Sequence, residues 1–244
     1  MEAVPVGDPL FRVDVIASTP NPQQACWLAM HNDYSEGYVL DGAIPSEERA
    51  GEYIVRHCLA GGRGHFGVIE HPQITFAIGN FPHSVAMQAR THRIASFDVQ
   101  SQRYTGKRVL AVADGLLPID DVFYSRPVGH YHDRQGKRYD VTDSDREEDL
   151  AFYMKAAKQY QRRINQGWAE EHARDILPQS IRQNFIVSFN ARSLCHFLDL
   201  RHKPDAQIEI QWLTHQMIPA FLDWMPSVAK WYVENRLNKG RLAP

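Results

Sequence analysis

Alternating hydrophobic and polar residues predict two strands in the first third of the chain. Residues 11–17 (FRVDVIA) alternate in this way, which is typical of a strand. In residues 73–79 (QITFAIG), Ile74, Phe76 and Ile78 fall on one face. Because successive side chains of a strand point to opposite sides, the second segment is predicted to be a half-buried strand with one face against a core.

Helix boundaries follow from residues that suit a first or last turn. Residues 45–48 (PSEE) begin a helix, since proline and acidic residues favour the first turn, and Gly61-Gly62 ends it. Pro82 begins a short helix that runs to about Arg90. These signals predict one helix before the second strand and one after it.

The second half of the chain has a helical pattern. Residues 144–147 (SDRE) form a capping box, and Gly167 ends the helix that follows. One stripe of that helix carries Leu150, Tyr153, Ala157, Tyr160 and Ile164. Further helices are predicted at about residues 169–176, 191–200, 206–222 and 228–237. A few early strands followed by many helices predict an α+β fold with a small, mostly antiparallel sheet.

The stretch between these halves, residues 111–143, is rich in Asp, Gly, Pro and Tyr. It contains HYHDRQGKRYDV, which predicts a polar hairpin around Gln135-Gly136. No Gly/Ser-rich or Pro-rich linker divides the 244 residues. We therefore predict a single domain over residues 1–244.

Composition and charge narrow the class of protein. With 43% hydrophobic and 23% charged residues, the chain has ordinary globular composition. A net charge of −2 disfavours a general nucleic-acid binder, so any anion site must be local. The cysteines at 26, 58 and 195 are widely spaced, which favours a reducing compartment. We expect a cytoplasmic protein, since no signal peptide and no apolar run of membrane-spanning length is recognisable.

The segment from Gln88 to Tyr104 (QARTHRIASFDVQSQRY) carries the candidate chemistry. It combines arginines with hydroxyl and amide side chains, which are donors suited to phosphate oxygens. Composition alone favours a solvated basic loop at a helix end over a ligand site. The residue types indicate a candidate phosphate or nucleotide site and nothing narrower.

The same segment resembles the signature of flavin-dependent thymidylate synthases, which is Arg-His-Arg, seven residues, Ser, one residue and Arg, commonly followed by Tyr. Here it is present as residues 91–93 (THR) and residues 101–104 (SQRY). Thr91 stands at the first arginine of the motif, although Arg90 precedes it. The motif is moderately specific by itself.

Two further blocks strengthen the resemblance. Residues 64–71 (GHFGVIEH) resemble a family segment, with Gly67 at its usual hydroxyl position. Downstream, Arg174 precedes a Leu-Pro pair, residues 190–192 (NAR) match a second family motif, and Arg201 ends the next helix. The resemblance covers about residues 45–110 and 145–225, and it covers residues 111–143 poorly.

The resemblance implies conversion of dUMP to dTMP, with methylenetetrahydrofolate as the carbon donor and FAD reduced by NADPH. It also implies a homotetramer with active sites shared between subunits. Arg201 is the implied catalytic residue at the uracil ring. The implied dUMP-binding residues are Gln88, Arg90, Gln100, Ser101, Gln102, Arg103, Arg174 and Arg201. The implied FAD-binding residues are His65, Gly67, Thr91, His92, Arg93, Asn190, Arg192 and His196.

Helical spacing is compatible with these roles. Arg192, His196 and Asp199 recur at three- and four-residue intervals, so they share one helix face. Leu194, Phe197 and Leu198 are predicted to be buried. His196 stands where the family more often has asparagine, and it retains a ring N–H for the flavin.

Two features of the sequence suggest a covalent nucleophile or a metal site. Cys195-His196 suggests a nucleophile, but a small buried core residue is favoured because Cys195 falls on the predicted apolar side of a helix, near Leu194 and Phe197. His65 with His71, or His130 with His132, suggests zinc, but no fourth ligand follows at a suitable spacing, and no metal is expected.

Two other functions remain open at this point. One is a nucleic-acid-binding module that uses the basic stretch 90–108, with Tyr104 stacking on a base. The other is an inactive nucleotide-binding homologue, which the departures Thr91, Val99 and Gly67 keep open.

Overall fold

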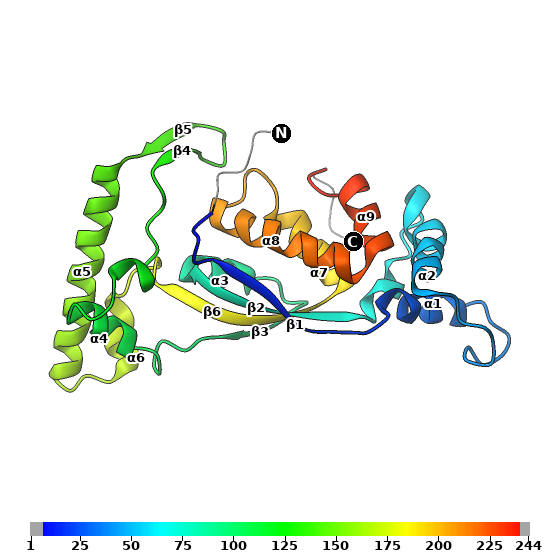
Figure 1. Cartoon of the computed structure of the whole chain (residues 1–244), viewed down its shortest axis with the longest axis horizontal. Helices are drawn as coiled ribbons and strands as arrows, with labels where there is room; N and C mark the ends of the chain where they lie inside the picture. The colour runs from blue at the N-terminus through cyan, green and yellow to red at the C-terminus, as the bar shows by residue number, and fades with distance from the viewer. Residues whose placement is uncertain (1–6, 240–244) are drawn as a thin grey trace. The chain divides into compact units, whose positions relative to one another are not determined.

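The computed structural model describes residues 7–239 (Figure 1). Residues 1–6 and 240–244 of the predicted domain lie outside the described residues. The described chain divides into two compact units, neither of which is continuous in sequence. Unit 1 comprises residues 7–12, 78–91 and 98–185, and unit 2 comprises residues 13–77, 92–97 and 186–239.

A four-stranded antiparallel sheet has the strand order β1-β2-β6-β3. Its strands are β1 (Arg12–Ser18), β2 (Gln73–Pro82), β3 (Ser96–Val99) and β6 (Arg182–Asn190). In β2, Ile74, Phe76 and Ile78 are all at most 2% exposed, as the alternation predicted. The small antiparallel sheet and the α+β class are therefore confirmed.

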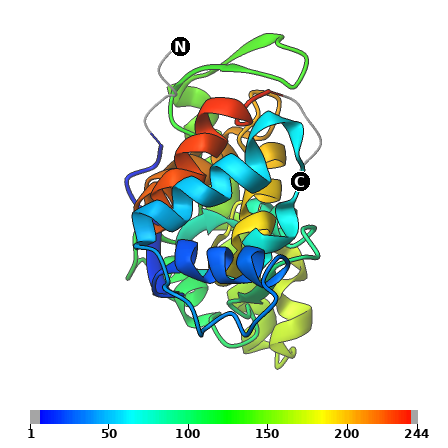
Figure 2. The same cartoon turned by 90° about the vertical axis from the view of Figure 1, so that its right-hand side faces the viewer.

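Unit 2 is built around five helices. These are α1 (Pro22–Asn32), α2 (Glu47–Ile54), α7 (Ala191–Arg201), α8 (Ile208–Trp224) and α9 (Pro226–Asn235). As Figure 2 shows, α1 lies against α2. Ser46 caps α2 by accepting a hydrogen bond from the Arg49 backbone N–H at 3.3 Å, as its position before two glutamates suggests. A π-helical turn, Val55–Leu59, continues α2 toward the predicted end at Gly61-Gly62.

The sequence did not predict α1, and its N-terminal cap explains why. Asn21 at the cap position makes no side-chain capping bond. The carboxylate of Glu47 from α2 instead accepts hydrogen bonds from the backbone N–H groups of Gln23 and Gln24, at 2.7 and 2.9 Å. Because the cap comes from another helix, no local sequence signal marks the start of α1.

Unit 1 places its hydrophobic core under the longest helix, α5 (Asp143–Asn165). The predicted stripe of α5 faces this core, with Tyr153, Ala157 and Tyr160 buried beside Val109 and Val112. The two ends of the stripe, Leu150 and Ile164, are partly buried against the same cluster. The other helices are α3 (His83–Ala89), α4 (Lys107–Ala113) and α6 (Glu170–Ala173).

The predicted hairpin is present in residues 129–141. Strand β4 (Gly129–His132) pairs antiparallel with β5 (Arg138–Val141), with Tyr131 opposite Tyr139. Their rings stack at a centroid distance of 5.8 Å. Gly136 in the turn has a φ of 82°, a conformation that glycine adopts readily. The hairpin prediction around Gln135-Gly136 is confirmed.

A buried arginine anchors the start of β6 in unit 1. Arg182 is 1% exposed, and it donates to the carbonyl oxygens of Asp120 and Asn80 at 2.7 and 3.0 Å. It also pairs with the Asp8 carboxylate at 2.6 Å. Loss of one partner would leave a buried charge uncompensated, which costs about 3–5 kcal/mol.

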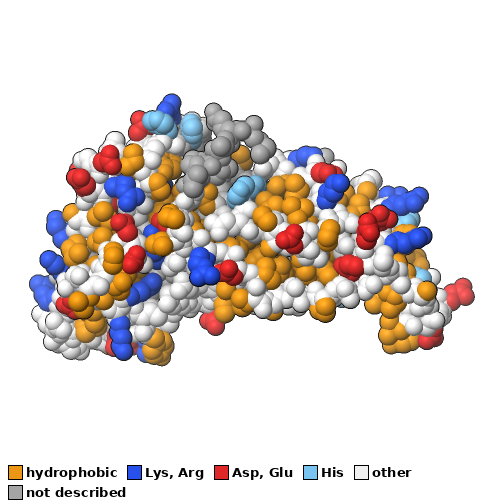
Figure 3. All heavy atoms as spheres, in the orientation of Figure 1, with side chains coloured by type: hydrophobic (Ala, Val, Ile, Leu, Met, Phe, Trp, Pro, Cys, Tyr) orange, Lys and Arg blue, Asp and Glu red, His pale blue; other side chains and the backbone are white. Residues whose placement is uncertain are grey.

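The surface carries charges of both signs. On the face shown in Figure 3, basic side chains lie among acidic ones and among hydrophobic patches. Exposed hydrophobic residues include Val15 and Ile16 of β1 and Ile186 of β6. Across residues 7–239, no helix combines the length and apolar character needed to cross a membrane.

The predicted capping box at residues 144–147 is wrong, and the true one lies two residues earlier. The Thr142 hydroxyl accepts a hydrogen bond from the Asp145 backbone N–H at 3.3 Å. The Asp145 carboxylate accepts from the Thr142 backbone N–H at 2.8 Å. Aspartate serves here in the role usually given to glutamate or glutamine, so the usual sequence pattern of a capping box favours Ser144 over Thr142.

Substitutions at Thr142 and at Ser144 will show which of the two residues caps α5. Thr142→Ala should lower the free energy of unfolding by about 1 kcal/mol, because it removes an N-cap oxygen. Ser144→Ala is the matched control and should be close to neutral, since Ser144 lies inside the helix. Urea denaturation of both variants measures the difference. A larger loss in the Ser144 variant would contradict this cap assignment.

Candidate active site

The junction between β6 and α7 positions the predicted residues of unit 2. Asn190 ends β6 and caps α7, with its side-chain oxygen accepting from the Ser193 backbone N–H at 2.7 Å. Arg192, His196 and Arg201 then follow along the helix. Because the cap occupies the Asn190 oxygen, the side-chain NH2 group is the part of Asn190 that can serve a ligand.

His92 from the signature segment contacts α7 directly. Arg201 Nε donates to His92 Nε2 at 2.9 Å. The His92 ring also meets the rings of His196 and Phe197 edge-on, at centroid distances of 5.3 and 4.9 Å. The structure thus brings together the predicted catalytic arginine and two predicted FAD-binding histidines.

The environment of His92 fixes its protonation state. Its side chain is 4% exposed, and burial, together with the charges of Arg201 and His196, lowers its pKa to about 4. His92 is therefore neutral near pH 7, which allows Nε2 to accept from Arg201 and leaves the proton on Nδ1. Within residues 7–239, Nδ1 is buried without a hydrogen-bond partner.

An ion pair joins α7 to residues 64–71, the first of the two further blocks that resemble the family. Arg192 Nη1 lies 2.5 Å from Glu70 Oε1, with both side chains more than a third exposed. His65 Nε2 lies 3.4 Å from the Asp33 carboxylate. A Cβ built on Gly67 would meet nothing within 4 Å, so crowding does not require glycine where the family carries a hydroxyl residue.

The predicted dUMP residues other than Arg201 belong to unit 1. Arg103 Nε lies 3.4 Å from the Glu171 carboxylate, and its guanidinium lies 5.7 Å from the Tyr104 ring centroid. The Ser101 hydroxyl accepts from the Arg103 backbone N–H at 3.3 Å. Arg174 begins the 3-10 turn after α6, three residues beyond Glu171.

The other predicted residues lie near the end of α3 and in the segment that follows it. At the end of α3, the Thr91 hydroxyl donates to the Gln88 carbonyl oxygen at 2.7 Å, and Arg90 is an exposed C-cap. The Gln100 side chain accepts from the Asn184 backbone N–H at 3.4 Å, so it supports β6. Gln102 is partly buried, and Arg93 is exposed.

Three charged or titratable residues near these positions were not predicted. Glu171 faces Arg103. Burial and the charges of Arg90 and Arg174 lower the pKa of His83. The Arg108 guanidinium has two buried nitrogens that lack a partner within the described chain. The spacing from Glu171 to Arg174 was a signal that could have identified the glutamate, because residues three apart in a helix are neighbours.

Cys195 is a buried core residue, as predicted. It is 1% exposed, and burial, the largest cause, raises the pKa of its thiol far above the ordinary value. A neutral, enclosed thiol is a poor nucleophile. No group of three or more His, Cys, Asp or Glu residues within 7–239 is placed to hold a metal ion.

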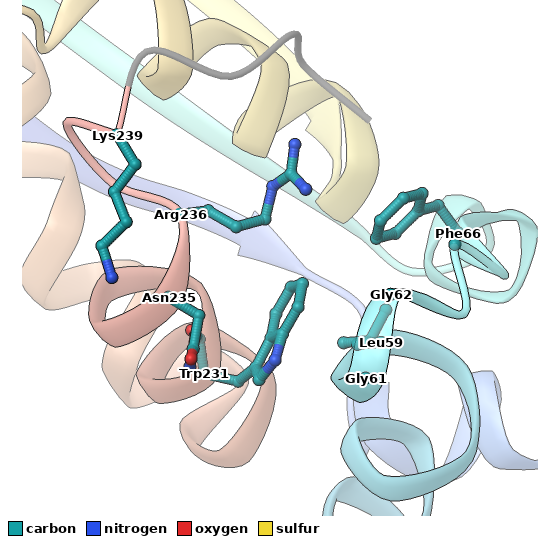
Figure 4. Close-up of a pocket in the computed structure, with 9 residues that line it drawn as sticks. Leu59, Gly61, Gly62, Phe66, Trp231, Asn235, Arg236 and Lys239 are labelled. Atoms are coloured by element: carbon teal, nitrogen blue, oxygen red, sulfur yellow. The ribbon is translucent and has the colours of Figure 1, made fainter.

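A pocket of about 370 Å³ lies in unit 2, and its lining includes Gly64 and Phe66 on either side of the predicted residue His65 (Figure 4). The rings of Phe66 and Trp231 meet there at 6.4 Å, and Arg236 lies 5.4 Å from the Phe66 ring centroid. Arg236 also pairs at 3.6 Å with Asp199, which accepts a hydrogen bond from the Tyr232 hydroxyl at 2.7 Å. The Asp199 carboxylate of α7 is therefore engaged with α9.

Comparison with known proteins gives consistent matches over most of the chain. A family described as thymidylate synthase complementing protein matches residues 14–227. A flavin-dependent thymidylate synthase of Halobacterium salinarum is 35% identical over 255 residues, which covers 96% of this chain and 100% of that protein. One from Haloarcula marismortui is 33% identical and covers 95% and 99%.

A solved structure has the same fold. The UMP/dUMP methylase PolB from Streptomyces cacaoi, bound with 5-Br dUMP, superposes with a TM-score of 0.70 at 26% identity. The alignment covers 96% of this chain and 97% of that one.

The lowered pKa of His92 predicts a pH-dependent stability. Between about pH 6.5 and 4 the unfolded chain binds a proton that the folded chain does not, so the free energy of unfolding falls as the pH falls through this range. The full effect is up to about 3 kcal/mol. Urea denaturation over this range should show a shallower pH dependence for His92→Gln, which cannot titrate. Identical slopes for the two proteins would refute the neutral buried histidine.

Proposed function

The chain belongs to the flavin-dependent thymidylate synthase family, and we propose that it converts dUMP to dTMP with FAD, NADPH and methylenetetrahydrofolate. The observation that carries this proposal is the contact between His92 and Arg201, which joins the signature segment to the last residue of α7. These residues are 109 positions apart, so the two matching blocks meet in space as well as in sequence order.

The residues present fit a flavin. His92 Nδ1 is a buried donor without a partner within the described residues, and a flavin ring offers carbonyl and nitrogen acceptors for it. Arg192 supplies a partly exposed cation beside Glu70, which suits the pyrophosphate. Asn190 retains its NH2 group, and His196 lies against His92. When bound and reduced by NADPH, FAD supplies the hydride that completes the methyl group.

The unit 1 residues suit the phosphate and sugar of dUMP. Arg103 offers a planar fork of donors, and the nearby Ser101 hydroxyl accepts from the Arg103 backbone N–H. Arg174 adds a second cation, and Gln88, Arg90, Gln100 and Gln102 complete the proposed set. The same group of donors would hold the phosphate in the ground state and in the transition state, so its main effect is on binding.

Arg201 has a different proposed task. Its Nε bond to His92 fixes the plane of the guanidinium. Burial lowers the pKa of Arg201, and the guanidinium of arginine stays charged in proteins. Placed against the uracil ring, that cation would stabilise negative charge that develops on the imide during the reaction. No covalent protein nucleophile is needed, which agrees with the enclosed Cys195 thiol.

Several parts of the proposal rest on the family resemblance alone. They are the identity of NADPH and the folate as reductant and carbon donor, and a homotetramer with active sites shared between subunits. We also propose one domain over residues 1–244, because no linker-like stretch divides the sequence, and a cytoplasmic location, because the widely spaced cysteines favour a reducing compartment. The alternatives differ in what they would bind. A nucleic-acid-binding module needs no flavin, and an inactive homologue would bind nucleotide without forming dTMP.

Reconstitution tests the cofactor and the activity together. After incubation with excess FAD and desalting, the protein should remain yellow. Addition of dUMP, methylenetetrahydrofolate and NADPH should then produce dTMP, detected by chromatography. A folded protein that stays colourless would exclude FAD as its cofactor. A yellow protein that binds dUMP but forms no dTMP would identify the inactive homologue.

Two arginine variants will separate binding from catalysis. Arg103→Lys keeps the charge but loses the fork, so dUMP binding should weaken by about 1–3 kcal/mol, with less effect on saturated turnover. Arg201→Lys should reduce turnover on the order of a hundredfold or more, because a preorganised donor is lost. Oxidation of pre-reduced flavin in a single turnover, measured across dUMP concentrations, isolates the chemical step. The roles are misassigned if the Arg201 variant reaches the wild-type rate at saturating dUMP.

A further inference from the structure

A carboxylate lies beside the arginines proposed to bind phosphate. Glu171 Oε2 is 3.4 Å from Arg103 Nε, and the two side chains are 38% and 49% exposed. Arg174 follows Glu171 by three residues on the same helical segment, a spacing that brings side chains together. The pKa of Glu171 is lowered by a hydrogen bond from its own backbone and by the charges of Arg103, His172 and Arg174. Glu171 is therefore an anion in this cluster at neutral pH.

We propose that Glu171 is an internal counter-anion of the phosphate subsite, which every phosphate-bearing ligand must displace from Arg103 and Arg174. This inference rests on the proposed function, in which these two arginines bind the phosphate of dUMP. Glu171 thereby sets the affinity of the subsite for phosphate-bearing ligands.

The chemistry of the two anions supports an exchange. A carboxylate presents one charge and two acceptor oxygens, whereas a phosphate monoester carries about −1.5 to −2 charges and three strong acceptor oxygens near pH 7. An arginine fork binds either group in the same geometry. The phosphate dianion thus replaces the carboxylate at the cost of one ion pair, and the arginines keep their positions.

Displacement of Glu171 has a small and predictable cost. Ion pairs between exposed side chains are weak. The pair between Glu171 and Arg103 therefore reduces the affinity for a ligand by only about two- to sixfold. The factor is the same for every ligand that uses the subsite, because each displaces the same carboxylate. A ligand with further contacts, such as dUMP through its uracil ring, still binds after this loss, while free phosphate starts from a weaker affinity that is reduced by the same factor.

The test compares Glu171→Gln with the matched control Glu170→Gln in the FAD-reconstituted protein. Both changes remove one negative charge from α6, so they share any long-range electrostatic effect. Calorimetric titration with inorganic phosphate, dUMP and deoxyuridine measures binding. Glu171→Gln should tighten phosphate and dUMP by the same factor, about two- to sixfold, and leave deoxyuridine unchanged. Glu170→Gln should change phosphate and dUMP affinity less than Glu171→Gln does.

Other results would overturn the inference. Equal gains in the two variants would show a general charge effect, and an unchanged or weaker phosphate affinity in Glu171→Gln would show that its carboxylate does not occupy the subsite. When Arg103→Gln is already present, Glu171→Gln should raise the phosphate affinity by a smaller factor, since the ion pair is already broken. Circular dichroism and a thermal melt confirm that each variant is folded. Failure of the proposed function appears separately, as absence of dUMP binding and dTMP formation in the wild-type protein.

Discussion

The arrangement of the unit 2 site depends on one hydrogen bond, from the Ser193 backbone N–H to the Asn190 side chain. This cap fixes the residue at which β6 ends and α7 begins, and so it sets the rotation of every later residue about the helix axis. With that start, Arg192 meets Glu70, His196 meets His92, and Leu194 and Phe197 enter the core. A shift of one residue would turn each of these side chains by about 100°.

Burial and hydrogen bonding act together on His92. Removal of the ring from water lowers its pKa, and the adjacent Arg201 cation lowers it further. The neutral ring is in turn what allows Arg201 to donate to Nε2. The same contact therefore orients a cation and leaves a donor, Nδ1, on the other side of the ring. One pairing thus serves both the proposed uracil site and the proposed flavin site.

Arginine pairs in this chain fall into two kinds with different energetics. Arg182 is buried with Asp8, and breaking that pair would leave an uncompensated charge. Arg103 with Glu171 and Arg192 with Glu70 are exposed pairs between side chains more than a third accessible to solvent. Exposed pairs contribute little to stability, so a ligand anion can replace the carboxylate at small cost. The buried pair stabilises the fold, and the exposed pairs keep arginine cations available to bind a ligand anion.

Periodicity in the sequence was enough to predict much of the fold. The alternation in β2, the stripe on α5 and the turn at Gly136 each depend on residues close in the chain. Strand β6 was missed although Phe185, Val187 and Phe189 alternate in it and are buried. The motif residues on α7 were also predictable, because helical spacing alone places Arg192 and His196 on one side.

Tertiary structure decided what local patterns do not contain. The cap of α1 comes from Glu47, and the bond between Arg201 and His92 spans 109 residues. The partner of Arg103 is Glu171, which is distant in sequence and carries no motif. The sequence by itself determined which residue types were available and the family to which they belong. Which of them pair was decided by folding, since a pairing depends on distances that only the packed chain defines.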